Sequence, residues 1–327
     1  MKAKYRTVWY SFWFFGIILS WNRVLIAQDS ISDSDSLYDL SLFDPSIDNP
    51  SYPYNKGPSI HLDEGHHNRH TYGGLGSFIA FRKVLSKDGY QVISFEDQFS
   101  DRSLKEIRLL VISCPQNEKN LWPNWHNPTF SALKRSEVKA LRDWVEQGGS
   151  LFLIVDHHPF PGAAQQLAMK FGFKLYNGHA EDTLIYPSYY NRTNNTLHSN
   201  VITNGRDPSE KIDSIITFSG SAIKIPDNAL PILTFNDGWV QWLPDIAWDI
   251  EDVEPESISG LAQGAYMDFG KGKFVIFADA NMFSAQDTDW GGKMGFIDPN
   301  AKYNYRLLLN IIHYLDFFTY NILTEEE

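Results

Sequence analysis

Apolar strand-like runs alternate with amphipathic helical segments along residues 59–173, and this alternation is the strongest constraint on the fold. Residues 108–114 (RLLVISC) and 150–156 (SLFLIVD) contain continuous apolar runs, which are typical of strands covered on both faces. The segments 76–89 and 136–149 repeat apolar side chains at helical spacing and end in glycine. Such alternation predicts an α/β fold with a mostly parallel sheet and right-handed crossover connections.

The same patterns give a list of expected elements. Strands are predicted over residues 59–64, 90–96, 108–114, 150–156 and 273–278. Helices are predicted over residues 76–89, 136–149, 162–173 and 303–320, with Ser136 as the N-cap of the second. A hairpin around residues 270–272 is expected to lead into the last strand.

The first 27 residues have the composition of a secretory signal peptide. Lys2, Lys4 and Arg6 precede an apolar run over residues 7–21, and cleavage is expected after Ala27. An uncleaved N-terminal anchor is the alternative, and it would be the protein's one contact with a membrane. Either reading predicts an extracytoplasmic protein, periplasmic or secreted.

Three further regions follow this segment. Residues 28–57 are rich in Ser, Asp and Pro and are expected to form a disordered linker. Residues 58–320 should form the α/β domain. Within it, residues 176–255 combine many turn-forming residues with short β-type runs, which predicts an irregular β-rich insertion.

Charge and cysteine content exclude several classes of protein. The formal net charge is −12 and no basic run interrupts the mature chain, so a nucleic-acid partner is not expected. Cys114 is the single cysteine, which excludes an internal disulfide and a zinc site built from four cysteines. No motif that would activate a catalytic thiol surrounds Cys114.

Three of the expected strands end in polar loops. The first loop is 63–70 (DEGHHNRH), the second is 156–159 (DHHP), and the third is 279–281 (DAN). Parallel strands bring their carboxyl ends to one edge of a sheet, where ligands of α/β proteins bind. We therefore expect one cleft to be surrounded by Asp63, His66, His67, Asp156, His157, His158 and Asp279.

Several kinds of chemistry fit these side chains. A divalent metal such as zinc could be held by His66, His67, His157 and His158, because imidazole suits such ions. Acid–base or nucleophilic assistance would use Asp63, Glu64, His67, Asp156 and His157. A ligand could be bound by His66, His70, His158, Asp279 and Asn281.

A structural role is the alternative for all of these residues. Strand-end carboxylates often cap helices or accept hydrogen bonds from loop amides, and none of the histidine spacings is a metal-binding signature. His61 and His313 are expected to pack in the core. The tryptophans of the loop-like segments could form a sugar or peptide platform, or pack beneath the loops.

The segments ALRDWVEQGGSLFLIVDHHPF and GKGKFVIFADANMFSAQ, with the opening DEGHHNRHT, resemble class I glutamine-amidotransferase-like domains of uncharacterised exported bacterial proteins. The resemblance implies a flavodoxin-like fold. Amidotransferases place a cysteine on a glycine-flanked turn after a central strand, whereas the comparable turn here reads Asp156-His157-His158-Pro159. The resemblance therefore does not imply thioester chemistry.

Two functions are compatible with these observations. The first is an exported amidotransferase-like module without amidotransferase activity, which binds a small molecule, a glycan or an envelope protein. The second is a periplasmic hydrolase that depends on a metal or on His/Asp assistance at the strand ends. A shared site among the strand-end histidines would favour the hydrolase.

Overall fold

The computed structural model describes residues 43–73, 78–183, 185, 187–218, 220–288 and 292–317. The expected signal peptide or anchor and the linker up to residue 42 lie outside the described residues, as does the segment 74–77. Within the described ranges, none of the helices has the length and apolar character needed to cross a membrane.

A nine-stranded sheet forms the centre of the domain, in the order β2-β1-β3-β4-β14-β13-β9-β5, with β10 also paired to β13. The parallel strands are β1 (Ser59–Asp63), β2 (Gln91–Phe95), β3 (Leu109–Ser113), β4 (Ser150–Ile154) and β14 (Gly272–Phe277). The antiparallel strands are β5 (Lys174–Leu175), β9 (Ile223–Lys224), β10 (Leu230–Thr234) and β13 (Ala262–Phe269). The parallel part has the strand order of flavodoxin-like folds, so the predicted fold class is confirmed.

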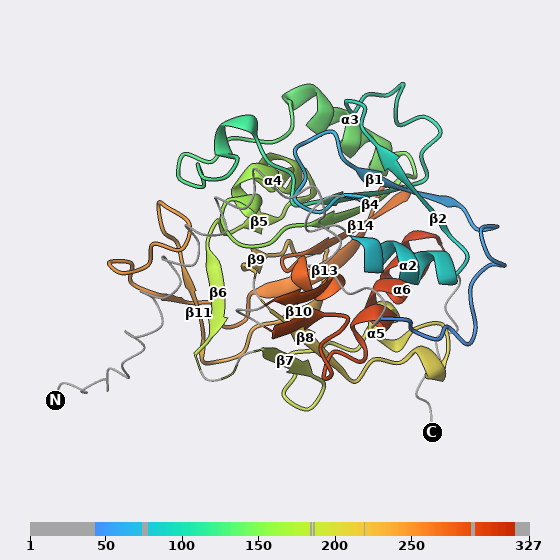
Figure 1. Ribbon diagram of the computed structural model, residues 1–327. Helices are drawn as coiled ribbons and strands as arrows, with labels where there is room; N and C mark the ends of the chain where they lie inside the picture. The colour runs from blue at the N-terminus through green and yellow to red at the C-terminus, as the bar shows by residue number, and fades with distance from the viewer. Residues whose placement is uncertain are drawn as a thin grey trace. The chain divides into compact units, whose positions relative to one another are not determined.

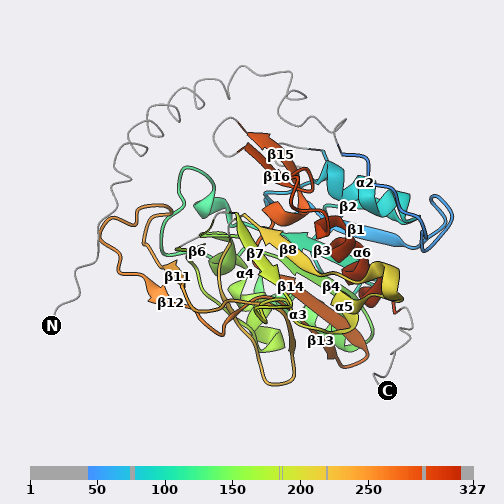
Figure 2. The same cartoon turned by 90° about the horizontal axis from the view of Figure 1, so that it is seen from below.

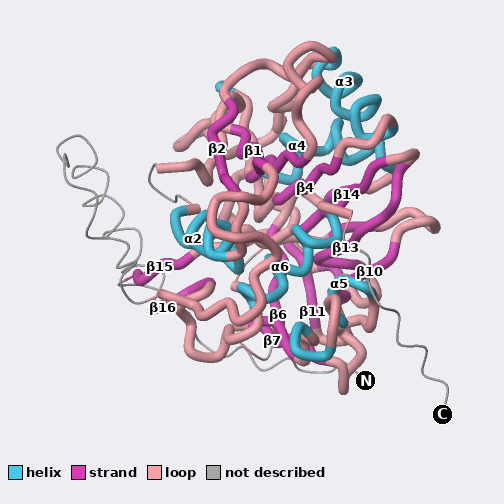
Figure 3. The backbone as a smooth tube through the Cα atoms, turned by 90° about the vertical axis from the view of Figure 1, so that its right-hand side faces the viewer, coloured by secondary structure: helices cyan, strands magenta, loops and turns pink. Residues whose placement is uncertain are grey.

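Helices cover both faces of this sheet (Figures 1 and 3). One face carries α3 (Arg135–Glu146) and α4 (Phe160–Ala168), and the other carries α2 (Ile79–Lys87), α5 (Val201–Asn204) and α6 (Asn304–Leu315). Every residue of β3 and β4 is buried, which explains their continuous apolar runs. Among the described residues, four short 3₁₀ helices accompany them: η3 (Glu118–Asn120), η4 (Met169–Phe171), η5 (Pro208–Glu210) and η6 (Asn281–Phe283).

Helix α3 starts earlier than the sequence pattern predicts. Lys134 occupies the N-cap position in place of the expected Ser136. Its backbone N–H donates to Oε2 of Glu137 at 2.9 Å, so a glutamate in the first turn caps the helix. Of the predicted apolar stripe, Val138, Leu141 and Val145 are buried and Trp144 is half-buried.

Residues 176–255 contribute to several sheets. They supply β9 and β10 to the central sheet, where both strands pair with β13. They also supply β6 (His179–Asp182) and β11 (Trp239–Trp242), which form a small sheet with β12 (Glu256–Ser257). Figure 2 shows this small sheet on the side of the domain away from α2. The remaining pairs are β7 (Ser188–Asn191) with β8 (Ser214–Thr217), and β15 (Ala285–Thr288) with β16 (Gly292–Gly295).

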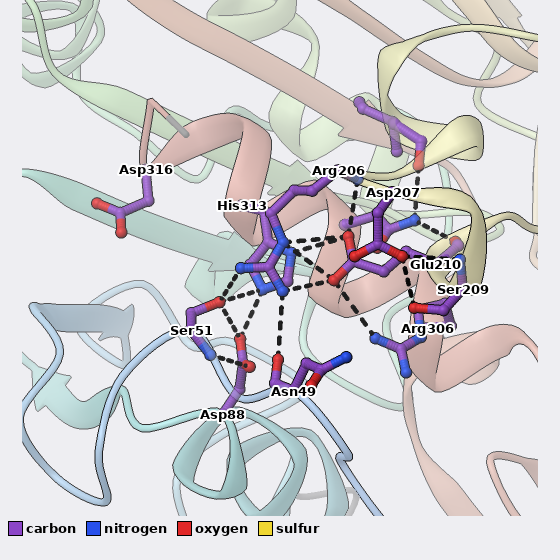
Figure 4. Close-up of polar contacts among 12 residues, drawn as sticks. Asn49, Ser51, Asp88, Arg206, Asp207, Ser209, Glu210, Arg306, His313 and Asp316 are labelled. Carbon is purple, nitrogen blue, oxygen red and sulfur yellow. Dashed lines mark hydrogen bonds and ion pairs between the residues drawn. The ribbon is translucent and has the colours of Figure 1, made fainter. Parts of the chain in front are cut away.

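A buried polar network ties the chain together where α2 ends and β2 begins (Figure 4). His313 of α6 is fully buried, as expected for a core histidine, and its Nε2 lies 2.6 Å from Oδ2 of Asp88. Ser51 Oγ lies 2.7 Å from the same nitrogen. Arg206 donates to Ser51 Oγ at 2.7 Å and from Nε to Glu210 Oε1 at 2.9 Å. This network joins the segment before β1 to α2, η5 and α6.

Candidate functional site

The polar loops at the carboxyl ends of β1, β3, β4 and β14 form the candidate site, at the opposite edge of the sheet from the His313 network. Strand order changes direction between β1 and β3, where flavodoxin-like folds bind their ligands. In this protein the loop after β1 crosses this position and hydrogen bonds to the loop after β3. Arg69 N–H donates to the Cys114 carbonyl at 3.0 Å, and Gln116 N–H donates to the His66 carbonyl at 2.9 Å.

His66 lies between two carboxylates beside this loop. Its Nδ1 is 2.8 Å from Asp63 Oδ1, its Nε2 is 3.1 Å from Glu137 Oε1, and its ring stacks on Phe99 with centroids 4.6 Å apart. Burial favours the neutral ring, but the hydrogen bonds and charges of Asp63 and Glu137 outweigh it and raise the pKa of His66. Because each ring nitrogen faces a carboxylate oxygen, the protonated ring is the form that the site stabilises.

Glu64 and His67 lie farther out on the same loop. Glu64 is half-buried and accepts hydrogen bonds from the Tyr72 backbone N–H and the Ser94 hydroxyl. His67 is exposed, with a φ of 49°, and its carbonyl accepts from Gln116 Nε2 at 3.0 Å. The positive φ directs this loop back towards β3, where its backbone is bonded.

The strand-end residues of β4 and β14 hydrogen bond to loop backbone. Asp156 accepts from the backbone N–H of His157 at 2.8 Å and of Ala280 at 3.3 Å. Asp279 accepts from Phe218 N–H at 2.6 Å and from Met282 N–H at 3.1 Å. These contacts correspond to the structural alternative for strand-end carboxylates.

Asn281 also hydrogen bonds to nearby residues of the chain. Its Oδ1 accepts from Gln286 Nε2 at 2.8 Å, and its carbonyl accepts from Ser284 Oγ at 2.8 Å. Asn281 therefore braces the turn that leads from η6 into β15.

His157 and His158 lie in an aromatic environment. The His157 ring lies 4.4 Å from Trp248 and 5.6 Å from Trp125 between centroids, and its Nδ1 is 2.7 Å from the His158 carbonyl oxygen. Only 1% of His158 is exposed, and neither of its ring nitrogens has a hydrogen-bond partner among the described residues. Burial lowers the pKa of His157, and it lowers the pKa of His158 to about 4.

The same environment extends to β6 and β11. His179 lies 4.8 Å from Trp248 and 6.2 Å from Trp242 between ring centroids. Burial, with a smaller effect from the charge of His157, lowers the pKa of His179 to about 4. These rings form what we call the tryptophan–histidine cluster, which consists of Trp122, Trp125, His157, His179, Trp242 and Trp248. Burial therefore favours the neutral form of His157, His158 and His179.

Two tryptophans expose this cluster to solvent. Trp122 is 39% exposed and lies 5.2 Å from Trp125 between ring centroids, and Trp248 is 38% exposed. Trp248 has a φ of 71°, a conformation that a bulky side chain rarely adopts. Such strain is found preferentially at functional positions.

The four histidines considered as metal ligands do not form one ligand group among the described residues. The group whose donor atoms all lie within 4.8 Å of one another is His70, Cys114 and Asp156, and all three are buried. The His70 ring stacks on Phe78, with centroids 4.7 Å apart. Burial lowers the pKa of His70 to about 3, and burial together with the Asp156 charge raises that of the Cys114 thiol.

Sequence reasoning missed two features of this edge. Glu137 was assigned only to a helix, although a glutamate in the first turn of α3 could have been recognised as a capping residue. The grouping of His70, Cys114 and Asp156 was also missed, because no local spacing marks it. The available signal was that these residues follow three strands, β1, β3 and β4, which are neighbours in the sheet.

In the polar network at the other edge, Ser51, His313 and Asp88 do not form a serine hydrolase triad. Ser51 Oγ and Asp88 Oδ2 both approach Nε2 of His313, at 2.7 Å and 2.6 Å. In a triad the serine and the aspartate contact different ring nitrogens, so that the ring can carry a proton between them.

Comparison with known proteins finds no matching family model and no matching curated protein. By structure, the chain is similar to the mmIFT52 N-terminal domain, with a TM-score of 0.55 and 12% identity over 78% of this chain and 96% of that one. At this identity the similarity concerns the fold.

A ThuA-like protein from Bacteroides uniformis has a TM-score of 0.40 and 10% identity, covering 83% of this chain and 94% of that one. The cytoplasmic protein STM3548 from Salmonella typhimurium has a TM-score of 0.42 and 12% identity, covering 79% and 98%. The latter two scores are too low to carry an argument, so the comparisons support the α/β fold alone.

Proposed function

We propose that this chain is a non-catalytic binding module with an amidotransferase-like fold, and that its ligand binds on the tryptophan–histidine cluster. The observation that supports this proposal is the exposure of Trp122 and Trp248 in one aromatic cluster, in which Trp248 lies against the imidazoles of His157 and His179. Exposed tryptophans are unusual on a soluble surface and are enriched where proteins bind ligands.

The chemistry of the cluster favours a glycan. Flat ring faces suit the apolar C–H face of a pyranose ring, and an indole N–H or a neutral imidazole can bond to the hydroxyl groups at its edge. Since burial holds His157 and His179 in the neutral form, the cluster offers no charge to match an ionic ligand.

The internal hydrogen bonds favour binding over catalysis. A general base needs a ring nitrogen or carboxylate oxygen directed at a substrate. Both ring nitrogens of His66 face carboxylates of the protein, and Asp156 and Asp279 accept hydrogen bonds from loop backbone. Cys114, the single thiol, is fully buried, so a thioester mechanism has no accessible nucleophile.

Glycan binding is tested by titration calorimetry and tryptophan fluorescence with a panel of glucose, mannose and N-acetylglucosamine oligomers. We expect binding to at least one series, weakened about tenfold or more by Trp122→Ala or Trp248→Ala, which corresponds to a loss of about 1.4 kcal/mol. Tyr54→Ala is the matched control, because Tyr54 is 71% exposed and lies outside the cluster.

Results of two kinds would contradict the proposal, one in the binding data and one in the reaction products. One is binding that both tryptophan variants leave unchanged, or no binding to any oligomer at millimolar concentration. The other is release of shorter sugars during incubation, which would show a hydrolase and would favour the alternative function.

We also propose that the module is exported, on the basis of the basic and apolar segments within residues 1–27. Expression of the full chain followed by cell fractionation and N-terminal sequencing tests this proposal. We expect a mature N-terminus at Gln28 in an extracytoplasmic fraction. A full-length protein in the membrane fraction would instead support the uncleaved anchor.

A further inference from the structure

We propose that His70, Cys114 and Asp156 bind a divalent ion of the zinc type inside the carboxyl edge of the central sheet. This inference does not depend on glycan binding, because none of the three residues belongs to the tryptophan–histidine cluster. It also differs from the four-histidine site expected from the sequence.

The donor atoms are close enough for one ion. One atom from each residue lies within 4.8 Å of the other two. Zinc binds nitrogen at about 2.0 Å and sulfur at about 2.3 Å, so tetrahedral ligands are separated by roughly 3.5 Å. The group therefore needs only a small contraction, of the order that side-chain rotation supplies.

Three neighbouring strands hold these ligands. His70 follows β1, Cys114 follows β3, and Asp156 follows β4. The Cys114 N–H donates to the Ile154 carbonyl at 2.8 Å, and the Cys114 carbonyl accepts from Arg69 N–H at 3.0 Å. The backbone on both sides of the cysteine is thus bonded to the segments that carry the other two ligands.

Cys114 also has an unusual backbone conformation. Its φ is 46°, which is costly for a residue other than glycine. Cys114 is followed by Pro115, and its side chain is fully buried. A glycine would satisfy this backbone without strain, so the presence of a cysteine indicates a role for its sulfur.

Charge balance explains how a buried site could hold the ion. The exposed fractions of His70, Cys114 and Asp156 are 4%, 0% and 2%. One thiolate, one carboxylate and one neutral imidazole together neutralise a divalent cation, as a site closed to bulk solvent requires. The thiolate and imidazole donors select zinc-type ions over calcium or magnesium, which prefer oxygen ligands.

A fourth ligand would be a water molecule. Ser113 is fully buried, and its Oγ has no hydrogen-bond partner among the described residues. Its hydroxyl influences the pKa of the Cys114 thiol, so the two side chains lie close together. A water in the fourth position would offer this hydroxyl a hydrogen-bond partner, as is common around metal ligands.

The experiment uses purified full-length protein, stripped with a chelator and reloaded with Zn²⁺ or Co²⁺. Elemental analysis should find about one ion per chain, and the Co²⁺ form should show the near-ultraviolet absorption of a thiolate–cobalt bond. Cys114→Ser should abolish that absorption, and His70→Gln should reduce the metal content severalfold. His67→Gln is the matched control, because His67 lies on the same loop but is exposed.

Any of three metal-binding results would overturn the proposal. The wild type could hold no more metal than Cys114→Ser, the Co²⁺ form could lack the thiolate band, or His67→Gln could lose as much metal as His70→Gln. If Cys114→Ser does not fold, as judged by circular dichroism, the His70→Gln comparison decides the question by the same criteria. Rapid alkylation of Cys114 in the folded, metal-loaded wild type would likewise contradict a bound thiolate.

Discussion

His66 and Glu137 are hydrogen bonded in the interior, with 3.1 Å between Nε2 and Oε1, although 71 positions separate them in the sequence. The same glutamate accepts from the backbone N–H groups of Phe99 at 3.2 Å and Lys134 at 2.9 Å. One buried carboxylate therefore joins the loop after β1, the loop after β2 and the first turn of α3. This contact holds the β1 loop in place at the carboxyl edge of the sheet.

Replacing this glutamate should destabilise the whole domain. Glu137→Gln removes the charge that pairs with the buried His66 and should lower the free energy of unfolding by about 3 kcal/mol. Urea unfolding followed by circular dichroism measures the change. Glu146→Gln on the same helix is the control, because Glu146 is exposed and its ion pair with Arg142 should contribute less than about 1 kcal/mol. Equal effects of the two variants would contradict the importance of the buried pair.

The effect of Glu137→Gln should also depend on pH. The pKa of His66 is raised above its ordinary 6.5, so its contribution to stability is complete below that value and is lost as the pH rises through the raised pKa. The pKa of Glu137 is lowered from 4.5, chiefly because its hydrogen bonds and the His66 charge outweigh burial, which opposes ionisation. Its contribution is therefore present above pH 4.5 and is lost as the pH falls through the lowered value.

The difference in unfolding free energy between wild type and Glu137→Gln should thus be largest between pH 4.5 and 6.5 and should decrease on both sides. Urea titrations over a pH series measure it, and subtraction cancels the titration of histidines that Glu137 does not contact. A difference that stays constant from about pH 5 to pH 9 would show that Glu137 does not stabilise the protonated form of His66.

The network at the opposite edge gives a second test of buried charge. Arg206→Met leaves Glu210, whose side chain is 2% exposed, without its bidentate partner, and should cost about 3 kcal/mol. Arg306 and His313 lie 3.8 Å and 4.0 Å from Glu210, and they should reduce the decrease in unfolding free energy. The double variant Arg206→Met/Glu210→Gln should recover part of it in a double-mutant cycle. Additive effects would contradict coupling of the two side chains.

Gly220 should be intolerant of any side chain. Its φ is 110°, and a Cβ there would lie 1.9 Å from the Ala278 carbonyl oxygen at the end of β14. Gly220→Ala should cost roughly 3 to 5 kcal/mol, from backbone strain and overpacking together. Gly238→Ala is the matched control: its φ is 99°, but nothing lies within 4 Å of its Cβ position. It should therefore show backbone strain alone, of about 1 to 2 kcal/mol. Thermal unfolding of both variants measures the difference, and equal melting temperatures would refute the clash.

Much of the parallel core could be predicted because local pattern and tertiary environment agree there. β3 and β4 read as continuous apolar runs and are buried at every position, and the hairpin at residues 270–272 joins β13 to β14 as expected. The start of α3 was predicted two residues late at its N-cap, because the sequence favours Ser136 whereas the backbone of Lys134 bonds to Glu137. The role of β9 and β10 in the central sheet was not evident either, since their pairing with β13 depends on an edge that exists only in the folded sheet.

The sequence by itself determined which elements form and which edge of the sheet carries polar loops, because hydrophobic period and strand direction are local properties. The tertiary structure alone decided how those polar side chains are used. It directed both nitrogens of His66 to carboxylates, surrounded His157 with indole rings, and gathered His70, Cys114 and Asp156. These outcomes depend on distances between residues far apart in the chain, and a linear pattern does not contain such distances.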